Sequence, residues 1–81
     1  MKMLDAAKVW VSRDEVASFN ACWPCSTLRT TRAYWFQFDP ANGDLIDCDV
    51  PEHDDGPAAT AMVDDCKAYY FTGEMPVWAN K

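Results

Sequence analysis

The stretch AYWFQFDPANGDLIDCDV, residues 33–50, predicts a β-hairpin. Its first six residues are rich in aromatic side chains, which are typical of strands. Strand alternation places Tyr34, Phe36 and Phe38 on one face, which needs a cover of apolar side chains. The Asn-Gly pair that follows supplies the positive φ angles of a tight turn, so we expect the chain to reverse there.

The return strand, residues 45–50, mixes apolar and acidic residues. Alternation gives this strand an apolar face of Ile46, Cys48 and Val50. The opposite face is largely acidic and consists of Leu45, Asp47 and Asp49. We therefore expect Asp47 and Asp49 to point outward, where reversal of their charge would remove no packing.

The residues before the hairpin predict a short strand and a helix. The segment KVWV, residues 8–11, alternates as a strand does. Ser12 and Glu15 have the spacing of a capping box, in which each side chain bonds the backbone N–H of the other residue. The helix that starts there should end before Pro24, because a proline disfavours helical backbone in the preceding residue.

The residues after the hairpin predict a second helix. Asp55 is its expected N-cap, and Pro57 suits the first helical turn. Apolar side chains then recur at helical spacing as far as Tyr69. Gly73 is a suitable C-terminal stop, and Trp78 beyond it is available to pack back onto the core.

Together these elements predict an α+β fold in one domain, residues 1–81. The expected order is a short N-terminal strand, a helix, the β-hairpin and a C-terminal helix. Both helices should pack on one face of a small antiparallel sheet. Phe36 and Phe38 should then be buried against Phe19 and Met62.

The charge of the chain narrows the class of partner. Acids outnumber bases by 13 to 7, so the formal net charge is −6. Nucleic-acid-binding proteins normally carry the opposite sign, so we expect a basic protein surface as partner and no direct nucleic-acid contact. No apolar run approaches the ~18 residues of a membrane span, and the first residues lack the apolar stretch of a signal peptide. We therefore expect a cytoplasmic protein with no membrane partner; its oligomeric state stays open.

Acidic residues concentrate in one half of the chain. Residues 33–66 contain nine Asp and Glu residues and no Lys or Arg. Alternate strand residues lie about 6.6–7 Å apart, close to two phosphate spacings along DNA, so carboxylates on a rigid surface could act as a DNA mimic. The predicted partner-binding residues are Asp44, Asp47, Asp49, Glu52, Asp54, Asp55, Asp64 and Asp65. Solubility and helix capping are an alternative role for the same carboxylates.

Four cysteines leave a metal site open as an alternative. Cys22 and Cys25 form a C-x-x-C pair. Further side chains of the types that zinc prefers are Cys48, His53 and Cys66. A zinc ribbon needs a second close pair, and Cys48 and Cys66 fall instead on expected apolar faces. The carboxylates lack EF-hand spacing, so calcium is not predicted either. We expect free thiols, no metal and no cofactor.

No residue is predicted to be catalytic. The C-x-x-C pair resembles the redox centre of thioredoxin-like proteins, in which the first cysteine begins a helix and its pKa is lowered. Cys22 falls at the end of a predicted helix, where the dipole acts in the opposite direction. A chain of this length also seldom encloses a substrate pocket of ~300 Å³ or more. We therefore expect a protein that is not an enzyme.

In size, acidity and compactness the chain resembles anti-CRISPR proteins, the small inhibitors that phages and mobile elements use against host defences. The resemblance covers the whole chain and rests on no sequence motif. It implies a non-enzymatic inhibitor that acts by protein–protein interaction in the host cytoplasm. Such an inhibitor binds a basic, nucleic-acid-binding surface of a larger complex, for example a CRISPR effector, and blocks DNA access by acidic mimicry or steric occlusion. The alternatives are a structural zinc module and an accessory protein that binds through a hydrophobic patch including Trp35 and Trp78.

Overall fold

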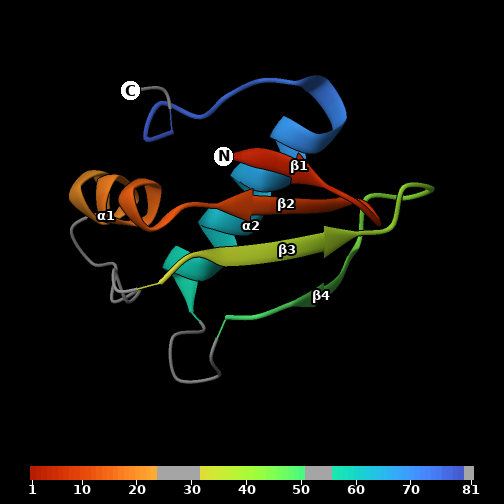
Figure 1. Ribbon diagram of the computed structural model, residues 1–81, viewed down its shortest axis with the longest axis horizontal. Coiled ribbons are helices and arrows are strands. Elements are labelled where there is room, and N and C mark those ends of the chain that lie inside the picture. Colours follow the sequence, from red (N-terminus) through yellow and green to blue (C-terminus); the bar gives the residue numbers. More distant parts are fainter. Residues whose placement is uncertain (24–31, 51–55, 80–81) are drawn as a thin grey trace.

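The computed structural model describes residues 1–23, 32–50 and 56–79. Its elements are, in chain order, β1 (Lys2–Leu4), β2 (Lys8–Val11), α1 (Arg13–Cys22), β3 (Tyr34–Phe38), β4 (Leu45–Cys48) and α2 (Pro57–Thr72). The strands form one antiparallel sheet in the order β1-β2-β3-β4. In Figure 1, α2 passes behind this sheet and α1 lies beside one end of β2. The predicted α+β fold is confirmed.

Strand β1 and the turn after it are absent from the sequence prediction. The turn contains two residues with positive φ, Ala6 at 63° and Ala7 at 58°. Alanine seldom adopts this conformation, so no turn signal marks the site. Two hydrogen bonds from β3 stabilise this turn. Gln37 Nε2 donates to the Ala6 carbonyl at 2.8 Å, and the Phe38 N–H donates to the Ala7 carbonyl at 3.0 Å.

The hairpin of β3 and β4 is confirmed, but its register is shifted by a β-bulge. Phe36 pairs with Cys48, whereas Phe38 pairs with Leu45, which leaves Ile46 without a partner. The prediction that Ile46 shares the apolar face is therefore wrong; Leu45 lies on the side of Phe38, and Ile46 is 58% exposed. A bulge inserts one extra residue, and that residue reverses the alternation on which the prediction depended.

Helix α1 begins as predicted. The Ser12 N–H donates to Glu15 Oε1 at 2.9 Å, and the Glu15 N–H donates to Ser12 Oγ at 3.2 Å, which completes the capping box. The helix ends at Cys22, and Trp23 is its C-cap. The Trp23 ring stacks on Phe19 with ring centroids 5.8 Å apart.

Helix α2 ends as predicted and begins differently. Gly56 is its N-cap, and because glycine has no side chain, the first turn has no side-chain cap. The expected cap, Asp55, lies outside the described residues. Pro57 occupies the first turn. Gly73 ends the helix with a φ of 75°, and its N–H donates to the Tyr69 carbonyl at 2.9 Å. Neither described helix has the length and apolar character needed to cross a membrane.

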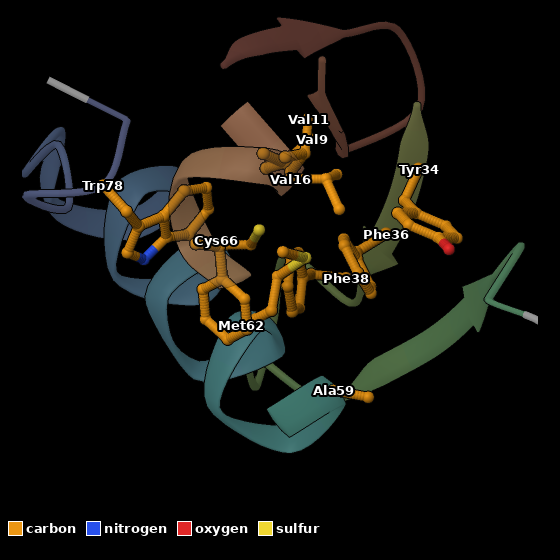
Figure 2. Packing of buried hydrophobic residues seen from close by; sticks show 11 residues of the cluster. Val9, Val11, Val16, Tyr34, Phe36, Phe38, Ala59, Met62, Cys66 and Trp78 are labelled. Atoms are coloured by element: carbon orange, nitrogen blue, oxygen red, sulfur yellow. The ribbon is translucent and has the colours of Figure 1, made fainter. Parts of the chain in front are cut away.

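The core lies between the sheet and the two helices (Figure 2). Its buried apolar residues are Val9, Val11, Val16, Phe19, Tyr34, Phe36, Phe38, Ala59, Met62, Cys66 and Trp78. Phe36 and Phe38 are fully buried in the same cluster as Phe19 and Met62, as predicted. Trp78 returns from beyond α2 and packs edge-on against Phe19, with ring centroids 5.2 Å apart.

Candidate protein-binding surface

Strand β4 is one edge of the sheet and carries an exposed acidic and apolar segment. We define the β4 edge as residues 44–47. All four side chains are exposed, Ile46 by 58% and Leu45 by 40%. Asp44 and Asp47 form no ion pair with any residue in the described ranges. Two exposed carboxylates that form no ion pair with a described residue therefore flank two exposed apolar side chains at this edge of the sheet.

Asp47 projects from the side of the sheet opposite the core. It pairs with Gln37, whose neighbours in β3, Phe36 and Phe38, are fully buried on the other side. Its Oδ1 accepts a hydrogen bond of 2.8 Å from the N–H of Cys48. The predicted outward direction of Asp47 is confirmed.

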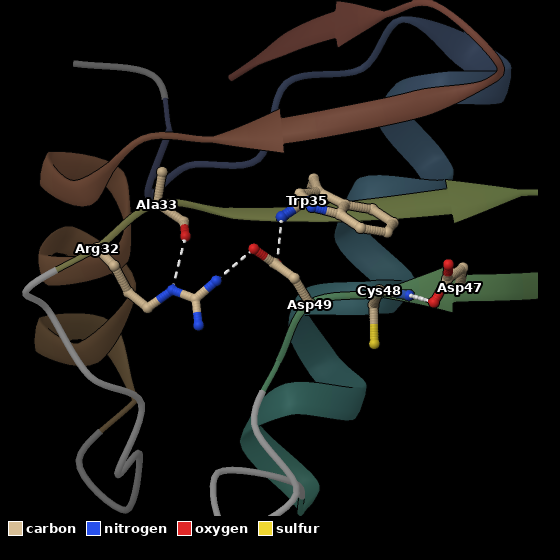
Figure 3. Close-up of polar contacts among 6 residues, drawn as sticks. All are labelled: Arg32, Ala33, Trp35, Asp47, Cys48 and Asp49. Atoms are coloured by element: carbon tan, nitrogen blue, oxygen red, sulfur yellow. Dashed lines mark hydrogen bonds and ion pairs between the residues drawn. The ribbon is translucent and has the colours of Figure 1, made fainter.

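Asp49 was also predicted to point outward, where reversal of its charge would remove no packing, but the structure gives it two structural contacts. One of its oxygens pairs with Arg32 Nη2, and the other accepts a hydrogen bond of 2.8 Å from the N–H of Trp35 (Figure 3). Arg32 Nε in turn donates to the Ala33 carbonyl at 3.2 Å. Asp49 thus fastens the end of β4 to the start of β3, and its charge is compensated.

The two predicted acids of α2 also differ from each other. Asp64 is exposed, whereas Asp65 Oδ2 accepts a hydrogen bond of 2.8 Å from Trp78 Nε1 and so holds that indole in the core. Helix α2 packs against the core side of β3, while Asp47 lies on the other side of the sheet. The structure therefore places Asp44 and Asp47 on the β4 edge, whereas Asp64 and Asp65 lie on α2 and not on this edge.

Three of the predicted acids, Glu52, Asp54 and Asp55, lie outside the described residues. The β4 edge ends a few residues before them in the chain.

An apolar groove of about 500 Å³ lies between β4 and α2. Leu45 and Cys48 line it from β4, Ala59 and Val63 line it from α2, and Phe36 contributes from the core. Because Leu45 belongs both to the groove and to the β4 edge, a partner on this edge could bury an apolar side chain next to the two carboxylates.

The cysteines differ in their surroundings. Cys22 is exposed, Cys48 is partly buried and Cys66 is fully buried. Burial raises the pKa of the Cys66 thiol, and the negative charges of Asp65 and Glu15 raise it further, so the thiol stays protonated and inert. Within the described ranges no three His, Cys, Asp or Glu side chains are grouped as metal ligands, and Cys25 and His53 lie outside those ranges.

The predicted aromatic patch is divided by the fold. Trp78 is 2% exposed and belongs to the core, so it cannot form a surface with Trp35. Trp35 pairs instead with Trp10 across β3 and β2, on the side of the sheet opposite the core. The sequence analysis did not predict this Trp10–Trp35 pair, although each tryptophan alternates with buried residues in its strand.

Comparisons with known proteins found no matching family model, no matching curated protein and no matching solved structure.

Proposed function

We propose that this protein is a non-enzymatic inhibitor that binds a basic protein surface through its β4 edge. The observation that carries this proposal is a pair of exposed carboxylates, Asp44 and Asp47, on either side of exposed apolar residues; neither carboxylate forms an ion pair with a described residue. Charged partners at the rim of an interface increase the association rate and set orientation, while apolar contacts supply much of the affinity.

The position of this segment at the sheet edge supports the same proposal. An edge strand presents backbone N–H and C=O groups that another chain can pair with, unless a bulge or charge prevents it. Here the bulge at Ile46 in the β3–β4 pairing bends and twists the edge strand, so we infer side-chain docking rather than strand addition. The apolar groove beside Leu45 offers a place for an aliphatic side chain of the partner.

The class of partner follows from the sign of the charge. A surface that binds nucleic acid is rich in Lys and Arg, so an acidic edge that occupies it would compete with DNA. We therefore infer an anti-CRISPR-like action in the cytoplasm of a host cell, in which a phage or mobile-element protein occludes the DNA-binding surface of a CRISPR effector.

A competition assay tests this function. The probe is a set of purified CRISPR effector complexes carrying guide RNA, and the readout is their binding to target DNA as this protein is added. We expect at least one complex to lose DNA binding, and the double variant Asp44→Lys with Asp47→Lys to be weaker by about tenfold or more, since like charges at an interface repel.

The matched control is Asp64→Lys, which makes the same charge change on α2 and should inhibit like the unmodified protein. Circular dichroism establishes that all variants are folded. Inhibition that survives the double reversal, or that Asp64→Lys weakens equally, would refute a role for the β4 edge. An absence of inhibition across all complexes would refute the proposed target class.

A further inference from the structure

The sheet has a second side that the two helices leave open. Burial alternates along β2 and β3, so that Val9 and Phe36 are fully buried while Trp10 and Trp35 keep part of their surface in solvent. Trp10 and Trp35 are direct cross-strand partners. Figure 1 views this side, with α2 behind the strands. Two indoles therefore lie next to each other on the open side of the two central strands.

Two lysines accompany these indoles. Lys2 Nζ lies 4.8 Å from the centroid of the Trp10 ring, and Lys8 Nζ lies 4.4 Å from the centroid of the Trp35 ring. Lys2 is also the cross-strand partner of Trp10. We call these four residues the Trp–Lys face. Each indole thus has a cation within reach that is held by another strand.

Charge is distributed unevenly over this side of the sheet. Lys2 and Lys8 lie on β1 and β2, whereas Asp47 lies on β4, beyond the indoles. The net charge of −6 is a sum over the chain and does not describe this face. Helix α2 and its carboxylates lie on the other side of the sheet (Figure 1). Asp14 and Glu15 of α1 line a pocket with Trp10, and Glu15 is paired with the N-terminal ammonium.

We propose that the Trp–Lys face binds single-stranded nucleic acid, with successive bases stacked on Trp10 and Trp35 and with phosphates paired to Lys2 and Lys8. Proteins that hold single strands combine aromatic side chains with nearby cations, because every base has a π-face and every nucleotide has a phosphate. This binding goes beyond the proposed function and uses different residues. It departs from the expectation, based on the net charge, that the protein makes no direct contact with nucleic acid.

The local contacts allow this occupant. Stacking of a base on an aromatic ring is stronger than an exposed cation–π contact, so a base can displace the lysine from the ring while the ammonium moves to a phosphate. The proposed contacts are ring stacking and pairing with phosphate, and neither of these reads a base edge or a 2′-hydroxyl. We therefore expect binding that tolerates changes of sequence and sugar.

Titration of the full chain tests this binding through its tryptophan fluorescence. The probes are oligothymidylate, oligouridylate, duplex DNA and polyglutamate. We expect the two single strands to quench the fluorescence with similar affinity and duplex DNA and polyglutamate to bind about tenfold more weakly or worse. The slope of log affinity against log salt should be about −1.4, because each of two lysines contributes about −0.7 on a single strand.

Polyglutamate that binds as tightly as oligothymidylate would show that charge alone acts, as for an acidic peptide partner, and would overturn this inference. Duplex DNA that binds equally well, a strong preference for one sugar, or an absence of quenching would overturn it as well.

Matched variants locate the site. Trp35→Leu should weaken oligothymidylate binding by about tenfold or more, and Trp35→Phe should restore most of it because a ring is retained. The control is Trp23→Leu at the end of α1, which is not part of this face, and it should leave oligothymidylate binding unchanged. Because the Trp23 ring stacks on Phe19, circular dichroism should establish that this variant is folded. Equal losses in Trp35→Leu and Trp23→Leu would place the binding elsewhere.

The lysines provide a test that does not depend on changing an aromatic residue. Lys8→Gln should reduce the salt slope by about 0.7, whereas Lys67→Gln on α2 should leave it unchanged. Asp47→Asn should tighten oligothymidylate binding by removing a nearby negative charge. The same change should weaken inhibition through the β4 edge, so the two proposals succeed or fail separately. An unchanged slope in Lys8→Gln would exclude this face.

Discussion

The two sides of the sheet use the same strands for different purposes. On the core side, Val9, Tyr34, Phe36 and Phe38 have no exposed surface, and their substitution should affect folding. On the open side, the Trp–Lys face and Asp47 remain in contact with water. Adjacent residues of one strand should therefore respond oppositely: one loses stability and its neighbour loses binding.

The largest contrast is expected between Phe36→Ala and Lys8→Ala. Removing the fully buried Phe36 ring leaves a cavity, so unfolding free energy should fall by about 3–5 kcal/mol. Lys8→Ala removes a cation–π contact with Trp35 and should cost less than about 1 kcal/mol. Urea denaturation of both variants measures the difference. If both variants lost a similar amount of unfolding free energy, the core side and the open side of the sheet would not differ in packing.

A smaller contrast is expected between Asp47 in β4 and Asp49, just beyond the end of this strand. Asp49→Ala removes the acceptor of the Trp35 N–H and the partner of Arg32, and should cost about 1–3 kcal/mol. Asp47→Ala should stay within about 0.5 kcal/mol, since Asp47 is exposed and forms no ion pair with a described residue. Thermal unfolding of the pair checks this. A stable Asp49→Ala protein would show that the contacts with Arg32 and Trp35 contribute little.

The features that the sequence predicts correctly are those with local causes. The capping box of Ser12 and Glu15, the aromatic alternation of β3 and the stop at Gly73 each depend on residues a few positions apart. Strand β1 was not predicted because it is three residues long and depends on pairing with β2 and on contacts from β3. The bulge at Ile46 is likewise a property of two paired strands rather than of one.

The same division applies to the predicted acids. Exposure of Asp44 and Asp47 follows from a turn and from alternation, which the sequence shows. The role of Asp49 depends on Arg32, 17 positions earlier, and that of Asp65 depends on Trp78, 13 positions later. A count of carboxylates along the chain cannot distinguish such paired acids from free ones, because their partners are brought close only by the fold.

Glu15 in helix α1 should make the stability of the protein depend on pH. Burial raises the pKa of the Glu15 carboxyl, but hydrogen bonds from the N-terminal ammonium and from Ser12 outweigh it, and the pKa is lowered. A lowered pKa stabilises the folded state above the ordinary carboxyl value of about 4.3, and this contribution is lost as pH falls through the lowered value.

Glu15→Gln therefore should cost roughly 0.5–1 kcal/mol at neutral pH, because glutamine keeps the capping-box acceptor but loses the charge. The difference from the unmodified protein should disappear in acid. Urea midpoints at neutral pH and below the lowered pKa measure this, with Asp14→Asn in the same helix as the control. If the two proteins still differed in stability in acid, the loss would come from the altered shape of the side chain and not from its charge.

The smallest expected effect compares the turns of the two hairpins. Ala7 has a φ of 58°, a conformation that costs an L-residue roughly 1–2 kcal/mol. Ala7→Gly removes this cost but gives the unfolded chain more freedom, worth about 0.4–1 kcal/mol, so a net gain of about 0.5 kcal/mol is expected.

Gly43 in the β3–β4 turn has a φ of 81°, and an added Cβ there would lie 2.9 Å from Lys67 Cε and 3.3 Å from Phe71 Cε2. Gly43→Ala should therefore destabilise the protein, and denaturation of both variants tests the opposite signs. Destabilisation by Ala7→Gly would show that its positive φ carries no strain that glycine can relieve.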